Sequence, residues 1–312
     1  QRKLRPYVSG RDGVFLTNTW GDGHRDACIN EAFLEREIAA GAELGVDVIQ
    51  IDDGWQKGHS ANSAKLARGE KGSWGKFRDD PTFWEFDPVR FPNGIAPLVK
   101  AAREKNLKFG LWYGPDSSND FAAWREDAEF LLKLHRDYGV DYFKLDSMKS
   151  ETALSQKRQQ RLFERLQEGS AGAITVDLDV TAGVRPGYFG VMSSGPVFVE
   201  NRYVRDSSET RIWWPHRTLR ELWLLSHAVD PVRMRMEVLN PERHPEYYGD
   251  DPLAPMKWPR DAIFAISMFA SPLGWFEIQK LSPATMAAWK PLVARWREER
   301  KALHTGTIYP VG

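Results

Sequence analysis

Short apolar runs alternate with longer amphipathic stretches along most of the chain. The runs are rich in Val, Ile, Leu and aromatic residues, and most of them end on or just before Gly, Asp or Asn. This alternation is typical of buried parallel strands that are connected by helices. Eight runs have this form, at residues 14–18, 46–51, 108–113, 141–146, 173–176, 197–200, 233–239 and 268–275.

Helical patterns fill the intervals between these runs. Two of them pass into the next apolar run through phrases of the same form, Ala-Glu-Leu-Gly-Val-Asp at 42–47 and Arg-Asp-Tyr-Gly-Val-Asp at 136–141. We expect Gly45 and Gly139 to end their helices, because glycine readily adopts the left-handed conformation found after a helix. The predicted helices span residues 29–44, 95–105, 121–138, 151–166, 217–228, 260–266 and 283–303.

Eight strand-helix units predict an α/β fold, a (β/α)8 TIM barrel. We expect one catalytic domain over residues 1–312, with the barrel at about 14–303. Active sites in such barrels lie at the carboxyl ends of the strands. The connection at about 54–93 is long, and irregular connections of that length are usually functional or disordered.

Composition excludes several classes of protein. The 43 basic and 43 acidic residues balance, so nothing indicates binding to nucleic acid or to a membrane surface. No apolar run approaches the ~20 residues of a membrane-spanning helix. The basic N-terminus has no apolar stretch after it, so we expect no signal peptide; it also lacks an initiator Met, as in a trimmed, soluble piece. The sequence does not indicate a compartment or an oligomeric state.

Metal and cofactor signatures are also missing from the sequence. The single cysteine, Cys28, excludes an intrachain disulfide and a cysteine-rich metal site. The seven histidines show no H-E-x-x-H spacing, and there is no P-loop, dinucleotide fingerprint or G-x-S-x-G motif. We therefore expect no metal and no cofactor.

Tryptophan is the compositional outlier, with 13 residues. Four of them, Trp20, Trp55, Trp112 and Trp275, lie near polar or glycine residues at expected strand ends. An aromatic face at such a place suits the apolar face of a sugar ring. Packing in the core or at the barrel rim is the alternative.

The segment from Tyr142 to Asp146 carries the strongest chemical signal. Lys144 and Asp146 are two residues apart in an expected strand, so both side chains point to the same face. A carboxylate near an ammonium stays ionised, which is the state that a carboxylate nucleophile needs. The alternative interpretation is a salt bridge at a strand end.

Carboxylates also follow other expected strands. Asp52 and Asp53 leave the run 46–51, where they suit neighbouring hydroxyls of a sugar or else form a solvated turn. Asp177 and Asp179 share a face by strand alternation. They either contact substrate or pair with Arg185, and we favour the ion pair.

Asp206 lies 60 residues after Asp146, two strand-helix units further around the barrel, and Arg202 precedes it. Two carboxylates that flank one bond are the minimum for glycoside hydrolysis. A charged surface loop is the competing interpretation for this segment.

Five motifs together resemble the melibiase, or α-galactosidase, clan of glycoside hydrolases, families 36 and 27, with family 31 more distant. They are NTWGD at 18–22, QIDDGWQ at 50–56, KFGLWYGP at 108–115, DYFKLD at 141–146 and RYVRD at 202–206, in order within about 14–276. The resemblance implies a retaining α-glycosidase of α-galactosidase type that acts on an oligosaccharide or α-glycoside. It implies that Asp146 is the nucleophile and Asp206 the acid/base. The expected sugar-contacting residues are Trp20, Asp52, Asp53, Trp55, Trp112, Lys144, Asp179 and Arg202.

The chain departs from family 36 in two places. Gly114 and Asp116 stand where a W-F-E-P-E pattern is common, and residues 177–187 lack the family's cysteine and glycine run. The flanking β-domains of that family do not fit in this sequence either, so we expect a trimmed catalytic domain. Glycosyl transfer to a sugar acceptor, as in raffinose-synthase-like relatives, is an alternative reaction. A carbohydrate-binding barrel without turnover and a family 31-like α-glucosidase or α-xylosidase are further alternatives.

Overall fold

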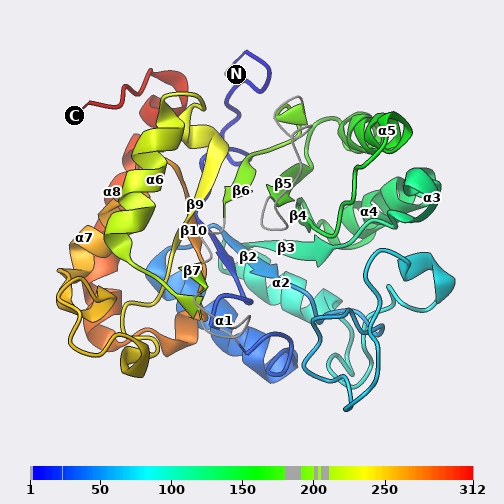
Figure 1. Ribbon diagram of the computed structural model, residues 1–312, viewed down its shortest axis with the longest axis horizontal. Coiled ribbons are helices and arrows are strands. Elements are labelled where there is room, and N and C mark those ends of the chain that lie inside the picture. Colours follow the sequence, from blue (N-terminus) through cyan, green and yellow to red (C-terminus); the bar gives the residue numbers. More distant parts are fainter. Residues whose placement is uncertain (1–2, 23, 180–190, 200–202, 205–210, 312) are drawn as a thin grey trace.

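The central feature of the computed structural model is a closed barrel of eight parallel strands (Figure 1). The structure describes residues 3–22, 24–179, 191–199, 203–204 and 211–311. Around the barrel the strands follow the order β1-β10-β9-β6-β5-β4-β3-β2, and β1 pairs with both β2 and β10. The strands are β1 (Leu16–Asn18), β2 (Val48–Ile51), β3 (Lys108–Tyr113), β4 (Tyr142–Leu145), β5 (Thr175–Asp179), β6 (Val197–Val199), β9 (Met234–Val238) and β10 (Ser271–Gly274).

Helices surround the strands, as Figure 1 shows. The α-helices are α1 (Glu31–Leu44), α2 (Ala96–Glu104), α3 (Ser118–Phe121), α4 (Trp124–Tyr138), α5 (Ala153–Gly169), α6 (Pro215–Ser226), α7 (Arg260–Ala265) and α8 (Pro283–Thr305). Short 3-10 helices are η1 (Phe77–Asp79), η3 (Pro231–Arg233), η4 (Pro245–Tyr247), η5 (Pro255–Lys257) and η6 (Ile278–Lys280). A small antiparallel pair, β7 (Tyr203–Val204) and β8 (Arg211–Ile212), lies outside the barrel sheet. None of the helices in the described ranges is long and apolar enough to cross a membrane.

The predicted (β/α)8 barrel is confirmed, and each predicted strand and helix overlaps an observed one. The prediction for the fifth strand was too short: it ended at 176, whereas β5 continues to Asp179. Acidic residues at 177 and 179 look like the start of a loop. Both are fully buried, however, because they face the polar interior of the barrel.

Residue alternation within each strand separates two environments. In β4, Phe143 and Leu145 are buried among apolar residues of the core, while Lys144 takes part in the polar interior. Strand register places Trp112 beside Lys144, and Lys144 beside Asp177, so these three positions share the inner face. The interior of this barrel is therefore a hydrogen-bonded polar layer, and the apolar core lies between strands and helices.

The two predicted helix ends are confirmed. Gly45 has φ 89° and its N–H donates to the carbonyl of Gly41, while Gly139 has φ 67° and donates to His135. Left-handed φ values of this kind favour glycine, so both helices end where the sequence predicts. At the other end of α1, the Asn30 side chain accepts a hydrogen bond from Phe33 N at 2.9 Å.

The long connection between β2 and α2 is a folded layer built around aromatic rings. Trp84 packs on Trp55 with ring centroids 5.6 Å apart and on Trp112 at 5.7 Å, and Phe77 meets Trp112 edge-on at 6.2 Å. An ion pair between Arg90 and Asp26, at 2.8 Å, ties this layer to the loop after β1. The rings of this layer therefore pack against the Trp112 side chain near the carboxyl ends of the strands.

A buried ion pair crosses the barrel interior below the strand ends. The Arg235 guanidinium in β9 donates to the Asp177 carboxylate in β5, and Gln50 in β2 donates to the second oxygen of Asp177 at 3.0 Å. Both charged side chains are at most 2% exposed. Removing one member of such a pair leaves an uncompensated charge in the interior, which usually costs about 3–5 kcal/mol.

We predict that Arg235→Met lowers the free energy of unfolding by about 3–5 kcal/mol, because Asp177 loses its cation. The double variant with Asp177→Asn keeps an acceptor for Gln50 and removes the charge, so it should recover a large part of that loss. Urea denaturation measures both. Lys133→Ala, at an exposed surface pair with Asp137, is the control and should change stability little. A double variant no more stable than Arg235→Met alone would contradict the assigned pairing.

Candidate active site

A buried ammonium organises the carboxyl end of the barrel. Lys144 Nζ lies 2.9 Å from Asp52 Oδ2 and 3.3 Å from Asp179 Oδ2, so it joins β2 and β5 across the interior. The ammonium also lies over the rings of Phe198 and Trp275, 4.7 and 4.9 Å from their centroids. Carboxylates on one side and aromatic faces on the other both stabilise a cation away from water.

Asp52 is held by several hydrogen bonds at the carboxyl end of β2. Its Oδ2 accepts from Lys144 and, at 2.7 Å, from Asn18 Nδ2, while its own N–H donates to Thr19 Oγ1 at 3.0 Å. Asn18 also donates to Gln50 Oε1 at 2.8 Å. These bonds fix the direction of the Asp52 carboxylate before any ligand arrives.

Asp146 directly follows β4 and carries a carboxylate that is held by N–H donors. Trp112 Nε1 donates to its Oδ2 at 3.3 Å, and the N–H of Ser147 donates to its Oδ1 at 2.5 Å. Ser147 has φ 59°, so the chain turns sharply out of the strand at this point and directs its amide back to the carboxylate. Donors of this kind stabilise the ionised form of a carboxylate, and Asp146 is 9% exposed.

The carboxylates paired with Lys144 differ from the one that the sequence pattern predicted. We expected its ammonium to face Asp146. Within the described residues, its ion pairs run to Asp52 and Asp179, while Trp112 and Ser147 donate to Asp146. Sequence alternation placed Lys144 on the inner face but gave no information on which of several inner carboxylates it meets.

Asp53 and Trp55 face the loop layer. Gln56 Nε2 donates to Asp53 Oδ1 at 2.6 Å, and Ser60 Oγ binds the other oxygen. Trp55 is fully buried, and its Nε1 donates to the carbonyl of Trp112 at 2.8 Å. Asp52 and Asp53 therefore occupy different surroundings: the first points into the barrel, and the second into the connection between β2 and α2.

Trp20 and Trp275 bring the loops after β1 and β10 together. A Cβ atom on Gly21 would lie 1.8 Å from the carbonyl oxygen of Trp275, so only glycine permits this contact. The N–H of Trp20 donates to Asn18 Oδ1 at 2.9 Å, and its side chain is 5% exposed. Trp275 thus lies next to Lys144, and Trp20 next to Asn18, at the carboxyl end of the barrel. We call this set of residues the rim.

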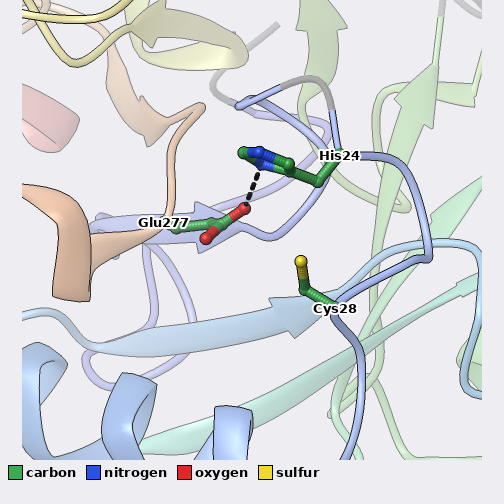
Figure 2. Close-up of side chains that lie close together, drawn as sticks. All are labelled: His24, Cys28 and Glu277. Atoms are coloured by element: carbon green, nitrogen blue, oxygen red, sulfur yellow. Dashed lines mark hydrogen bonds and ion pairs between the residues drawn. The ribbon is translucent and has the colours of Figure 1, made fainter.

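Behind these indoles lies a second polar contact between the same loops. Asp22 Oδ2 accepts the N–H of Glu277 at 2.9 Å, and Asp22 Oδ1 lies 3.7 Å from Arg243 Nε. Burial raises the pKa of Asp22 above its ordinary value, against the effect of Arg243. Three potential metal ligands, His24, Cys28 and Glu277, also gather here (Figure 2).

Two residues of the predicted site, Arg202 and Asp206, lie outside the described residues, as does Arg185. Among the described ones, the structure brings together Trp112 with Asp146, and Lys144 with Asp52 and Asp179. Sequence reasoning missed the interior roles of Gln50, Phe198 and Arg235. Strand alternation contains the signal, since these three share the inner face with predicted site residues.

Chemically, the arrangement offers a carboxylate held by N–H donors at the barrel mouth and a donor-acceptor pair beside it, with indole faces nearby. A carboxylate of this kind can act as a nucleophile toward an electrophilic carbon. In the Lys144–Asp52 pair a hydrogen-bond donor lies beside an acceptor. Such a pair can bind two neighbouring hydroxyl groups of one ligand.

No protein-family model matches the chain. Several curated proteins are similar to part of it. The alpha-galactosidase 1 of Pediococcus pentosaceus is 27% identical over 135 residues, which are 43% of this chain and 16% of that protein. Probable alpha-galactosidase G of Aspergillus terreus is 33% identical over 126 residues, 38% of this chain and 15% of that protein. The chain thus matches only about a sixth of the length of these relatives.

Solved structures resemble nearly the whole chain. The GH36 alpha-galactosidase AgaA from Geobacillus stearothermophilus has a TM-score of 0.63 and 16% identity, over 96% of this chain and 43% of its own. A variant of that enzyme in complex with raffinose has a TM-score of 0.66 and 16% identity, over 96% of this chain and 44% of its own. At such identity the likeness shows the fold, which agrees with the closed barrel.

Asp53 gives a prediction about pH. Burial raises its pKa to about 7, from an ordinary value of 3.8. The folded state therefore favours protonated Asp53, and the stability that this gives is complete at about pH 4 and is lost as the pH rises to about 7. Asp53→Asn cannot ionise. We predict that the stability of this variant relative to wild type increases over that range by up to about 1.4 kcal/mol per pH unit.

Urea denaturation at several pH values measures this difference. The exposed position 261 supplies the control, because Asp261→Asn should follow the wild-type curve throughout. Parallel curves for wild type and Asp53→Asn would show that Asp53 is ionised in both states.

Proposed function

We propose that this chain is the catalytic barrel of a retaining α-glycoside hydrolase that removes a terminal α-linked, galactose-type sugar. The observation that carries the proposal is the placement of Asp146. It directly follows a barrel strand, its carboxylate accepts hydrogen bonds from Trp112 and Ser147, and it keeps some exposure. Catalytic residues of TIM barrels lie at this end of the strands.

Asp146 acts as the nucleophile in this mechanism. Its carboxylate attacks the anomeric carbon, the glycosidic bond breaks, and a covalent glycosyl-enzyme forms. Asp206, protonated, gives its proton to the departing oxygen. It then takes a proton from water, which releases the sugar with its original anomeric configuration. A retaining enzyme needs its two carboxyl groups about 5–5.5 Å apart.

Trp112 keeps the nucleophile in position. Its indole N–H donates to Asp146, and its ring is braced by Trp84 and Phe77 of the long connection. The hydrogen bond stabilises the negative charge before the attack, and it weakens when the oxygen becomes an ester. A rigid donor of this kind costs little reorganisation during the reaction.

The sugar would be held by Asp52, Lys144 and the indoles of the rim. Lys144 and Asp52 are at most 3% exposed in their side chains and fixed by other bonds, so they are preorganised to recognise two neighbouring hydroxyls. Trp275 lies beside Lys144, and Trp20 is bonded through its N–H to Asn18, which also donates to Asp52; both indoles suit the apolar face of the ring. Asp53 is bonded to Gln56 and Ser60 within the connection between β2 and α2. We therefore assign it to holding that connection in place, and not to binding the sugar.

Similarity supports the choice of galactose. The curated relatives that match this chain are alpha-galactosidases, and structures that share its fold include an alpha-galactosidase variant with bound raffinose. Raffinose or a related oligosaccharide is accordingly the substrate class that we propose here.

Asp146→Asn tests the assignment. We predict that turnover of p-nitrophenyl α-galactoside falls at least about a thousandfold, because a neutral amide cannot attack the anomeric carbon. The amide oxygen still accepts the bond from Trp112, so the melting temperature should stay near the wild-type value. The control is Asp137→Asn on the outer surface of α4, which should keep full activity.

The assay is best run on the longest form of the protein in which this chain occurs. Substantial turnover by folded Asp146→Asn would contradict its role as nucleophile. If wild type releases p-nitrophenol from a glucoside or xyloside and not from the galactoside, the sugar is wrong while the mechanism stands.

A further inference from the structure

Three side chains with different metal-binding atoms meet where the loops after β1 and β10 touch. His24 and Cys28 come from the first loop, and Glu277 comes from the second (Figure 2). Their nitrogen, sulfur and oxygen atoms all lie within 4.8 Å of one another. A turn in which Ala27 N donates to the carbonyl of His24 brings His24 and Cys28 to the same side of the loop.

The contacts of His24 call for a cation at this place. Its Nδ1 lies 2.9 Å from Glu277 Oε1 and 3.0 Å from Lys280 Nζ. A histidine nitrogen either donates or accepts a hydrogen bond, so it cannot donate to the carboxylate and accept from the ammonium together. Lys280 also lies 2.7 Å from Glu277 Oε2. The ammonium thus occupies a position between a ring nitrogen and a carboxylate, and both of these groups are also metal ligands.

We propose that His24, Cys28 and Glu277 form a Zn²⁺ site in which the metal takes the place of the Lys280 ammonium. Imidazole, thiolate and carboxylate are the ligands that Zn²⁺ combines in proteins, at about 2.0–2.3 Å. Three protein ligands leave the fourth tetrahedral position to water or a small anion. The Cys28 sulfur binds as a thiolate, so metal binding releases its proton.

Glu277 is fixed by buried hydrogen bonds, whereas the side chains of His24 and Lys280 are exposed and can move. Glu277 is 2% exposed, and its N–H is held by Asp22. The next two amides, of Ile278 and Gln279, both donate to the buried carboxylate of Glu37 at 3.0 Å. The side chains of His24 and Lys280, in contrast, are 46% and 41% exposed. His24 can therefore rotate toward the metal and Lys280 can swing into solvent, while the Glu277 backbone stays in place.

Zn²⁺ at this site would add a link between two loops that already meet through Asp22, through His24 and through the contact of Gly21 with Trp275. Any ligand that binds the folded state alone stabilises it. We therefore expect the metal to raise the melting temperature. This inference does not depend on the proposed glycosidase activity, because its test needs no substrate.

The test is calorimetric titration of the reduced protein with ZnCl₂ alone. Wild type should bind one Zn²⁺, and Cys28→Ser and His24→Gln should each weaken binding at least about tenfold. Lys280→Met should tighten binding about tenfold, because the competing cation is gone. Co²⁺ provides a second readout, since wild type should show a sulfur-to-cobalt charge-transfer band that Cys28→Ser lacks.

His244→Gln is the matched control. His244 also lies beside a carboxylate, Glu246 at 3.1 Å, and it is no member of the proposed cluster. It should bind Zn²⁺ as wild type does. The proposal is overturned if wild type binds no Zn²⁺, or if Cys28→Ser binds as tightly as wild type. Unchanged affinity in Lys280→Met would also overturn it, because the metal would then not take the place of the Lys280 ammonium.

Discussion

The site depends on the buried ammonium of Lys144, which can stay in the barrel only because carboxylates surround it. Asp52 and Asp179 approach it from two strands, and Asn18 and Gln50 extend the network to β1. A second buried cation, Arg235, pairs with Asp177 deeper in the barrel. Buried charges of this kind cost free energy when one partner is lost, so the interior acts as a unit. Its rigidity is what gives a ligand fixed donors and acceptors.

Trp112 connects this interior to the outer layers. Its neighbour in the strand register is Lys144, its indole N–H reaches Asp146, and its ring rests on Trp84 from the long connection. From its length alone, the connection between β2 and α2 was expected to be functional or disordered. Its packing gives a structural reason for that length. It packs against the residue that positions the proposed nucleophile, and Asp53 and Trp55 serve that packing from within.

The alternation of apolar runs with helical stretches was enough to predict the barrel, and residue alternation within β4 separates outward Phe143 and Leu145 from the inward positions. The same alternation placed Lys144 on the inner face. It did not predict that Lys144 meets Asp52 and Asp179, because pairing across a barrel depends on register between distant strands. It also ended the fifth strand too early at 176, since buried acids resemble a loop. The cluster of His24, Cys28 and Glu277 was invisible for a related reason: its third member lies about 250 residues away in sequence.

The central claim is that Asp146 forms a bond to the sugar during turnover. A fluorinated α-galactosyl fluoride, which forms the glycosyl-enzyme but releases it slowly, tests this directly through mass spectrometry of the digested protein. The account predicts one added fluorosugar per chain, on the peptide that contains Asp146 and on that residue. A label on another carboxylate, or a protein that turns over substrate and never carries the label, would contradict it.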